Sequence, residues 1–402
     1  MHPDYLAPGV LLGVFSWKDK EVRLLGFASL IAFHQILSIT MPQPFLYVAI
    51  TNHGFGHATR MASVVAEIQR LCPEVLVALA TTSPRWLLES YLQQDFIHRH
   101  AVLDIGVIQQ DSLAMDRVAT LEKLNQLRLQ EKQLVAGEAH FIQQNRMSLV
   151  LADIPPIATS IAQAAGVPCW MMSNFGWDFI YRPWGDAFTE IADWIAKRFS
   201  QCDQLFRLPF HESMSAFPTI TDVGLTGGSP HYSIEELRNQ FNLTAPVERT
   251  VLMTFGGLGL EQIPYQNLSK FPDWQFLTFD RNAPNLPNLL RISDHRYRPV
   301  DFMPLCRCVI SKPGFSTFAE ACRLDVPIVS ITREGFAEAP ILLAGMQDHN
   351  PHQILTPVEF FQGDWQFLHK PPDPPRTPIP VAKDGNATIA RAVVEYLHRD
   401  NG

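Results

Sequence analysis

Apolar and polar positions alternate along this chain in a pattern that predicts a repeated strand and helix arrangement. From residue 45 onward, short apolar runs are each followed by a longer stretch in which apolar residues recur at helical spacing. Such alternation is typical of βαβ units and a parallel sheet. In the first half of the chain we predict strands at 45–50, 75–80, 101–108, 149–152 and 169–173.

A second series of the same kind begins after a stretch rich in Gly, Pro and Ser at 227–233. Two α/β series predict two doubly wound domains that face each other across a cleft, where ligands of such sheets bind. The strands predicted for the second series are 250–254, 275–279, 309–311 and 328–331. We assign 41–230 to an N-terminal domain, 245–370 to a C-terminal domain and 371–402 to a Pro-rich linker with a final helix.

Helix boundaries can also be predicted. Pro155 and Pro156 suit a first turn, and the helix that follows them should end at Gly166. The polar segment 111–145 reads as a helix that could break at Gly137. In the last segment, we predict that Asn386 caps the final helix.

Residues 1–40 form an extension of uncertain status. An apolar stretch at 24–39 follows three basic residues, but two polar residues interrupt it and no small-x-small cleavage site is present. The stretch is also shorter than the ~20 apolar residues of a spanning helix. Two interpretations stay open: Met41 is the true first residue, or the stretch is a peripheral amphipathic anchor.

Composition predicts a folded protein and excludes some partners. Of 402 residues, 47% are apolar and 18% charged, which is far from the composition of disordered chains. The formal net charge is −8 and no Lys/Arg-rich run occurs, so we expect no nucleic-acid partner. The six cysteines form no CxxC pair and most lie in apolar runs, so we expect reduced thiols and a cytoplasmic location.

Three glycine loops that follow predicted strands are the candidate ligand-binding segments. The first, at 51–59 (TNHGFGHAT), carries Gly54 and Gly56 just before a helix, and glycine lets a backbone approach a ligand closely. This loop is not the Rossmann G-x-G-x-x-G, and the chain has no Walker motif, so neither NAD nor P-loop binding of ATP is predicted.

The other two loops lie in the C-terminal domain, at 255–259 (FGGLG) and 311–317 (SKPGFST). The third loop leads into a helix, whose free N–H groups and dipole attract anions. The candidate binding residues of these loops are Gly256, Gly257, Gly314, Ser316 and Thr317.

Glu320 lies one turn into the helix that follows the third loop, where a carboxylate could accept both hydroxyls of a ribose. A structural alternative stays open. Ser316 could simply cap this helix, and Glu320 could make a charge interaction with its first turn.

Four motifs carry a family resemblance. The segments GFGHATR (54–60), DIPPIA (153–158), SNFGWDFIY (173–181) and KPGFST (312–317) resemble the glycosyltransferase-like N-terminal region of plant-type L-arabinokinases. The whole arrangement resembles the GT-B glycosyltransferases, most closely family 28, which includes the peptidoglycan GlcNAc transferase. The likeness covers about 45–364, and because no sugar-kinase domain follows in this sequence, kinase activity is not expected.

The resemblance implies a division of labour. The C-terminal domain would hold a nucleotide diphosphate sugar on the second and third glycine loops with Glu320 on the ribose, and the N-terminal domain would hold the acceptor near His57. No metal and no cofactor is expected, since helix-end N–H groups would stabilise the leaving diphosphate and the chain has no Asp-x-Asp motif. The chain departs from the family at Lys312 and Pro313, and its acceptor region matches no enzyme we can assign.

His57 is the candidate general base, because a neutral imidazole could take the proton of an acceptor hydroxyl. Asp153, after another strand of the same domain, could orient that imidazole. The alternatives are that His57 bonds a loop carbonyl and that Asp153 caps the helix beginning at Pro155. His53 is the second candidate base.

Two further groups could contact a sugar. The aromatic stretch 175–184 suits stacking on a sugar ring, and equally suits core or lid packing. Arg333, Glu334 and Glu338 follow a strand at the place where members of the family contact the donor sugar, although surface charges explain them equally well.

The function predicted from these observations is a metal-independent transfer of a hexosyl group from a nucleotide diphosphate sugar, UDP-linked, to an acceptor hydroxyl. The alternatives are a sugar-nucleotide 2-epimerase and a non-catalytic protein that binds sugar nucleotides. The acceptor, a sugar, a lipid or a metabolite, stays open. A lipid acceptor would suit peripheral attachment at the inner face of the membrane.

Overall fold

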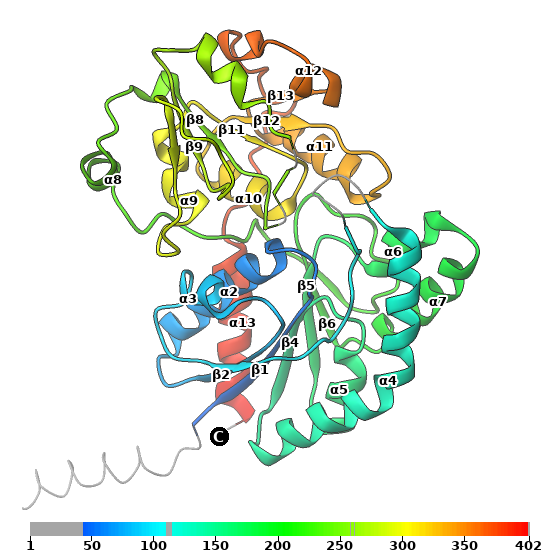
Figure 1. The fold of residues 1–402 in the computed structure, drawn as a ribbon. Coiled ribbons are helices and arrows are strands. Elements are labelled where there is room, and N and C mark those ends of the chain that lie inside the picture. Colours follow the sequence, from blue (N-terminus) through cyan, green and yellow to red (C-terminus); the bar gives the residue numbers. More distant parts are fainter. Residues whose placement is uncertain (1–42, 110–114, 258, 261, 401–402) are drawn as a thin grey trace, which may run out of the picture. The chain divides into compact units, whose positions relative to one another are not determined.

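The computed structural model describes residues 43–109, 115–257, 259–260 and 262–400. Residues 44–400 form one compact unit that contains two parallel sheets (Figure 1). The N-terminal stretch for which two interpretations were open lies outside the described residues.

The first sheet has seven strands in the order β3-β2-β1-β4-β5-β6-β7, and every pairing is parallel. Its strands are β1 (Phe45–Ile50), β2 (Leu76–Ala80), β3 (Ile97–Arg99), β4 (Leu149–Asp153), β5 (Cys169–Ser173), β6 (Gln204–Arg207) and β7 (Ile220–Asp222). The helices connecting them are α2 (Gly56–Leu71), α3 (Arg85–Glu89), α4 (Arg117–Gln144), α5 (Ala158–Ala165), α6 (Trp177–Tyr181), the 3-10 turn η1 (Arg182–Trp184) and α7 (Ala187–Phe199).

The second sheet has six strands in the order β10-β9-β8-β11-β12-β13, again all parallel. Its strands are β8 (Thr250–Met253), β9 (Gln275–Thr278), β10 (Leu289–Arg291), β11 (Cys308–Ser311), β12 (Ile328–Ile331) and β13 (His352–Leu355). Its α-helices are α8 (Ile234–Phe241), α9 (Pro299–Phe302), α10 (Phe315–Arg323), α11 (Glu338–His349) and α12 (Pro357–Phe361), and the chain then ends with helix α13 (Gly385–Asp400). The 3-10 turns are η2 (Val247–Arg249), η3 (Tyr265–Lys270), η4 (Met303–Leu305) and η5 (Gln366–His369).

Both sheets follow the same doubly wound order, in which the direction of winding reverses beside the first strand of the series. The reversal lies between β1 and β4 in the first sheet, and between β8 and β11 in the second. Loops that follow these four strands therefore diverge and leave room for a ligand. The loops after β1, β8 and β11 carry predicted site residues, and β4 ends at another, Asp153.

The central strands are apolar on both faces because helices cover both sides of a parallel sheet. Successive residues of β1 contribute to two different cores: Leu46 and Val48 pack into one, and Tyr47 and Ala49 into the other. This burial explains why continuous apolar runs, rather than alternating ones, predicted the central strands. The predicted fold class, α/β with two doubly wound sheets, is confirmed.

One predicted strand is wrong. Residues 101–108 form no strand, and the third strand of the first sheet is the short β3 instead. Polar groups of this segment bond to side chains rather than to a neighbouring strand: the Gly106 carbonyl accepts from the Tyr181 hydroxyl (2.5 Å), and the Val107 N–H donates to His53 Nδ1 (3.2 Å). The apolar run thus forms a loop against the site.

Two helix predictions also need correction. Helix α4 runs without a break through Gly137 and is capped by Asp116, whose carboxylate accepts from the Ala119 N–H. The predicted start, at 111–114, lies outside the described residues. Asn386 does not precede the last helix but lies in the first turn of α13, where its side chain bonds Gly227.

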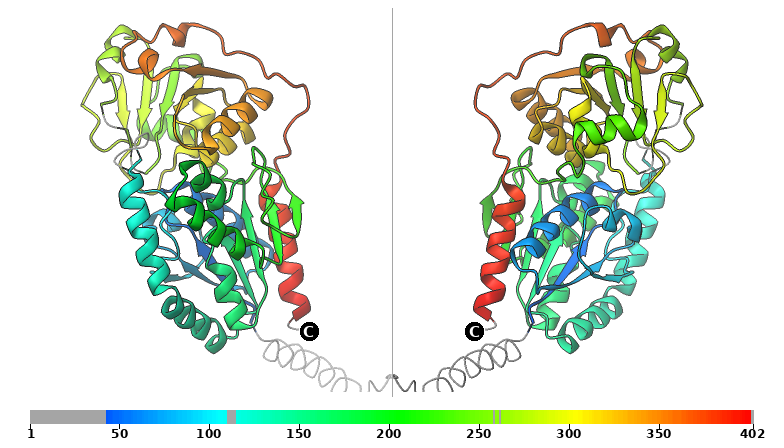
Figure 2. Two further views of the ribbon diagram at one scale, coloured as in Figure 1. Left: turned by 90° about the vertical axis from the view of Figure 1, so that its right-hand side faces the viewer. Right: turned by 90° about the vertical axis from the view of Figure 1, so that its left-hand side faces the viewer.

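The C-terminal helix returns to the first sheet after a Pro-rich stretch, and it packs along α2 (Figure 2). The Tyr396 hydroxyl donates to the Ser148 carbonyl (3.3 Å), and the Tyr396 ring packs edge-on against Trp170.

All six cysteines lie in the described part and are buried free thiols. Among the described residues, no helix combines the length and the apolar character needed to cross a bilayer.

Candidate active site

One pocket of about 520 Å³ is lined by loops that follow strands of both sheets. Residues 53–60 come from the loop after β1 and the start of α2. From the second sheet come the loops after β8 and β11, together with residues 279–282, 292–295 and 297–299, which follow β9 and β10. All the predicted glycine loops therefore meet at one cavity.

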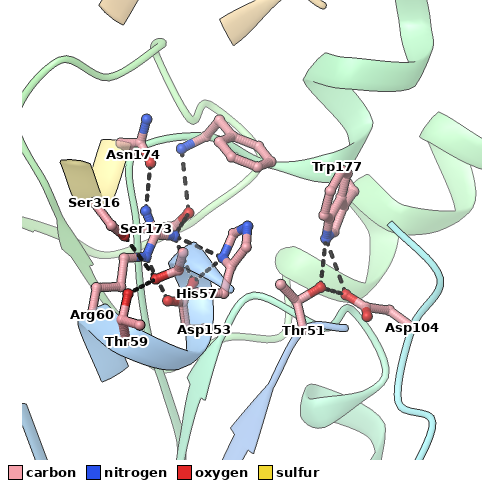
Figure 3. A network of polar contacts seen from close by, with 12 residues as sticks. Thr51, His57, Thr59, Arg60, Asp104, Asp153, Ser173, Asn174, Trp177 and Ser316 are labelled. Carbon is pink, nitrogen blue, oxygen red and sulfur yellow. Dashed lines mark hydrogen bonds and ion pairs between the residues drawn. The ribbon is translucent and has the colours of Figure 1, made fainter. Parts of the chain in front are cut away.

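His57 and Asp153 lie together in this structure (Figure 3), with 2.9 Å between Nδ1 and Oδ1. His57 belongs to the first turn of α2, and Asp153 is the last residue of β4, whose register places it beside Ile50. Both side chains are buried, with 7% and 0% exposed. With its Nδ1 against Asp153, the imidazole retains Nε2 for contact with a ligand, and His57 lines the pocket.

Arg60 is the third member of this cluster, and no role was predicted for it. Its Nε and one terminal nitrogen bond the two oxygens of Asp153 at 2.5 and 2.6 Å, so the pair is bidentate. The same guanidinium reaches Asn174 Oδ1 at 2.8 Å. Arg60 lies one turn after His57, an i, i+3 spacing that could have suggested a shared face.

The cluster fixes the protonation states of its members. Burial alone would raise the pKa of Asp153, but the charges of Arg60 and His57 and their hydrogen bonds outweigh it and lower that pKa. Burial lowers the pKa of His57, and Arg60 adds to this effect although Asp153 opposes it. The imidazole is therefore neutral and the carboxylate charged at neutral pH. Because Asp153 contacts His57 and Arg60, and α5 begins only at Ala158, it does not cap that helix.

Asn174, which accepts a hydrogen bond from Arg60, makes a second buried contact. The side-chain N–H of Asn174 donates to Glu338 Oε1 at 2.7 Å, which links the loop after β5 to the start of α11. Glu338 lines the pocket and is only 7% exposed, and burial raises its pKa. Arg333 is also buried in the pocket wall, whereas Glu334 is exposed and lies outside it.

Asp104 is a buried acid that sequence reasoning missed, because it lies in the run predicted as a strand. Its carboxylate accepts from the Asn52 N–H at 2.9 Å and from Trp177 Nε1 at 3.1 Å, and it also contacts Thr51 Oγ1 (Figure 3). Burial raises its pKa to about 7 in spite of these hydrogen bonds. Asp104 therefore holds a proton in the folded protein at pH values where the unfolded chain has released it.

We expect this proton to make stability depend on pH. Between about pH 4 and 7 the folded state binds one more proton than the unfolded state, so the free energy of unfolding should fall as pH rises. A change in pKa from 3.8 to about 7 corresponds to on the order of 4 kcal/mol. Urea unfolding at several pH values should show this loss in the wild type but not in Asp104→Asn.

A matched control is Glu334→Gln, which removes an exposed acid outside the pocket. It should leave the pH dependence of the wild type unchanged. A parallel pH dependence in the wild type and in Asp104→Asn would show that Asp104 is ionised in the folded protein.

The aromatic stretch 175–184 is mostly packing. Trp177 and Tyr181 are each 1% exposed and stack on one another, with ring centroids 5.7 Å apart. Phe175 lines the pocket, and His53 packs between Trp177 and Phe336. Burial, then the nearby His57, Lys312 and Arg333, lower the pKa of His53 well below its ordinary value, so this imidazole is neutral too.

The third glycine loop has an open position at Gly314, which precedes α10 and has extended backbone angles. A Cβ atom at Gly314 would have only the Lys312 carbonyl near it, at 4.0 Å. Ser316 does not cap α10: its hydroxyl donates to the Gly56 carbonyl at 2.7 Å. The hydrogen of this hydroxyl is therefore directed at the first glycine loop rather than at a ligand.

The other loop positions require glycine for different physical reasons. Gly54 and Gly256 have φ of +63° and +78°, which side chains other than glycine rarely adopt. A Cβ at Gly257 would lie 2.6 Å from the Phe55 ring, and one at Gly56 would lie 3.2 Å from Ser316 Oγ. These two glycines thus allow the loops of the two sheets to touch each other.

Glu320 lines the pocket and is 4% exposed. It accepts from the Gly228 N–H at 2.9 Å and from the Tyr91 hydroxyl at 3.2 Å, and both bonds reach Oε1. Tyr91 follows α3 on the first sheet, so this contact joins the two halves of the pocket. Glu320 therefore makes buried hydrogen bonds outside α10, and its role is not limited to a charge interaction with the first turn of that helix.

Comparison with known proteins gives one relative by sequence. The chain is 29% identical over 327 residues to an L-arabinokinase of Arabidopsis thaliana, a match that covers 79% of this chain and 31% of the relative. The chain thus spans about a third of that protein's length. No protein-family model matches the chain.

Solved structures give a clearer result for the fold. A UDP-glucosyltransferase from Polygonum tinctorium that glucosylates indoxyl superposes with a TM-score of 0.55 over 90% of this chain and 94% of its own, at 11% identity. The chain has the GT-B glycosyltransferase fold. A candidate UDP-N-acetylglucosamine 2-epimerase from Listeria monocytogenes is similar as well, with a TM-score of 0.53 over 89% and 97% of the two chains at 12% identity.

Proposed function

We propose that this chain is a metal-independent glycosyltransferase that moves a hexosyl group from a UDP-linked sugar to an acceptor hydroxyl. The observation that carries the proposal is that His57, which bonds the buried Asp153, and the N-terminus of α10 line one and the same pocket. A neutral base and an anion-binding helix end are the two groups that such a transfer needs. The GT-B fold, shared with the Polygonum UDP-glucosyltransferase, supports the same activity.

The second sheet would hold the donor. The diphosphate would lie on the N–H groups of residues 314–317 and beside the glycine loop after β8, with Lys312 and Arg333 in the same wall to balance its charge. These groups would replace a divalent cation. Glu320 would accept the ribose hydroxyls from its position in the first turns of α10.

The first sheet would hold the acceptor. His57 Nε2 would take the proton of the acceptor hydroxyl as its oxygen forms a bond to the anomeric carbon. At the same time the bond from that carbon to the diphosphate oxygen would break, and the diphosphate would leave with the electron pair. Asp153 would stabilise the resulting imidazolium, and Arg60 would hold Asp153 in place.

A pentosyl group is the second candidate, because the relative at 29% identity is named an L-arabinokinase. The similar fold of the candidate 2-epimerase keeps epimerisation as an alternative, and a protein that binds sugar nucleotides without turnover is a third.

A panel of sugar nucleotides tests these functions together. The protein is incubated with UDP-hexoses and with UDP-L-arabinose, and products are read by mass spectrometry and chromatography. Slow hydrolysis or transfer to an added acceptor supports the proposal. Formation of an epimer supports the epimerase, and binding without any product contradicts an enzymatic role.

Metal independence is tested by chelation. We expect turnover of the active donor to continue in excess EDTA, because helix-end N–H groups and two cationic side chains would stabilise the leaving diphosphate. Loss of turnover, followed by recovery on addition of Mg²⁺ or Mn²⁺, would contradict this expectation.

A further inference from the structure

Three metal-ligating side chains gather away from the pocket, where the C-terminal helix meets the end of α2. Cys72 Sγ lies 3.8 Å from His398 Nε2, and Glu74 Oε1 also lies 3.8 Å from that nitrogen. All three ligand atoms lie within 4.8 Å of one another. None of the three residues lines the pocket.

The local fold brings these residues together. Cys72 is the residue at which α2 ends, and its N–H bonds the Ile68 carbonyl. Glu74 follows two residues later, just before β2, and His398 lies in the last turn of α13. Because α13 packs along α2, the ends of the two helices meet, as the contact of Cys72 with His398 shows.

The spacing of the ligand atoms suits a tetrahedral ion. Zn–S and Zn–N bonds of about 2.3 and 2.05 Å at a tetrahedral angle place the two ligand atoms roughly 3.6 Å apart. A small movement of the side chains would bring the observed 3.8 Å between Cys72 Sγ and His398 Nε2 to this value. The exposed side chains of Glu74 and His398 can make that adjustment without disturbing the core, since they are 56% and 55% exposed.

The chemical types of the three ligand atoms indicate which ion the site would bind. A thiolate, an imidazole and a carboxylate suit Zn²⁺, whereas Ca²⁺ and Mg²⁺ take oxygen ligands. We propose that Cys72, Glu74 and His398 bind Zn²⁺, with water as the fourth ligand, and that the ion fastens the C-terminal helix to the first sheet. Because Cys72 is 1% exposed while its two partners face solvent, the ion would lie at the surface with one protected sulfur ligand.

A cysteine binds Zn²⁺ as the thiolate, so binding of the ion at Cys72 should release the proton of the thiol. Because an ion that binds only the folded state stabilises it, Zn²⁺ should also raise the melting temperature.

The test uses the untagged full-length protein and competition for Zn²⁺ with a chromophoric chelator. We expect one equivalent to bind, with affinity at least about 100-fold lower in His398→Gln, since loss of an outer partner alone costs 10- to 100-fold. Co²⁺ in place of Zn²⁺ should give a thiolate-to-cobalt charge-transfer band that Cys72→Ser lacks. His398→Gln changes an exposed residue, so this variant should fold.

His100→Gln, which removes an exposed histidine next to β3, is the matched control and should bind Zn²⁺ as the wild type does. Equal affinity in the wild type and His398→Gln, or a Co²⁺ complex without the thiolate band, would overturn the proposal. The outcome is independent of the proposed transferase activity, because EDTA should lower the melting temperature without lowering turnover.

Discussion

Gly314→Val should abolish UDP binding while the protein stays folded. The backbone of Gly314 is extended (φ −163°), which valine adopts readily, and only the Lys312 carbonyl comes within 4.0 Å of an added Cβ. The added methyl groups would therefore enter the pocket rather than the protein core. They would block the approach of a diphosphate to the N-terminus of α10, so we expect UDP affinity, measured by calorimetry, to fall at least about 100-fold, or roughly 2.7 kcal/mol.

Gly137→Val is the matched control for this variant. Gly137 lies exposed in the interior of α4, nothing comes within 4 Å of an added Cβ, and the position is remote from the pocket lining. The control should bind UDP normally. Gly256→Val would be a poorer test, since φ at that glycine is +78° and a side chain would strain the loop itself. Unchanged UDP affinity in Gly314→Val would place the diphosphate elsewhere.

Central strands could be predicted from the sequence, because burial on both faces leaves an apolar run that a local window detects. Three predicted strands, at Phe45–Ile50, Cys169–Ser173 and Ile328–Ile331, have the observed bounds. The edge strands β7 and β10 were missed because each has only three residues and several of these are exposed or half-buried. At 101–108 the apolar run was real, but its polar groups bond side chains of the site.

The site could be predicted only where position along a strand determined it. His57 and Gly314 follow strands beside a reversal of winding, and Asp153 is the last residue of such a strand. The carboxyl ends of parallel strands share one edge. Asp104 and the contact of Glu338 with Asn174 could not be found this way. Their roles depend on contacts between residues far apart in the chain, such as Asn174 with Glu338 across 164 positions.

The role of Arg60 also depends on a contact with a residue far away in the chain, and its effect there is electrostatic. A buried carboxylate at Asp153 needs compensation, and the bidentate guanidinium supplies it. Once Arg60 neutralises Asp153, the aspartate no longer needs a charged histidine. The imidazole of His57 can therefore stay neutral while it is held in a fixed orientation, which is the state that a general base requires.

His57→Ala should lower kcat about 100-fold or more while UDP affinity stays nearly intact, because the proposed donor loops belong to the second sheet. The pKa of His57 is lowered by burial, so wild-type activity should fall only as pH drops below the ordinary histidine value of 6.5, and that acid limb should vanish in the variant.

His57→Gln, which can still bond Asp153 but cannot accept a proton, should lose kcat to a similar extent, whereas the exposed-site variant His100→Gln should not. A near-normal kcat in His57→Ala with the acid limb retained would move the base elsewhere, with His53 the next to test. Loss of UDP binding instead would show that the first glycine loop contacts the phosphates, and the two sheets would then not divide donor and acceptor as proposed.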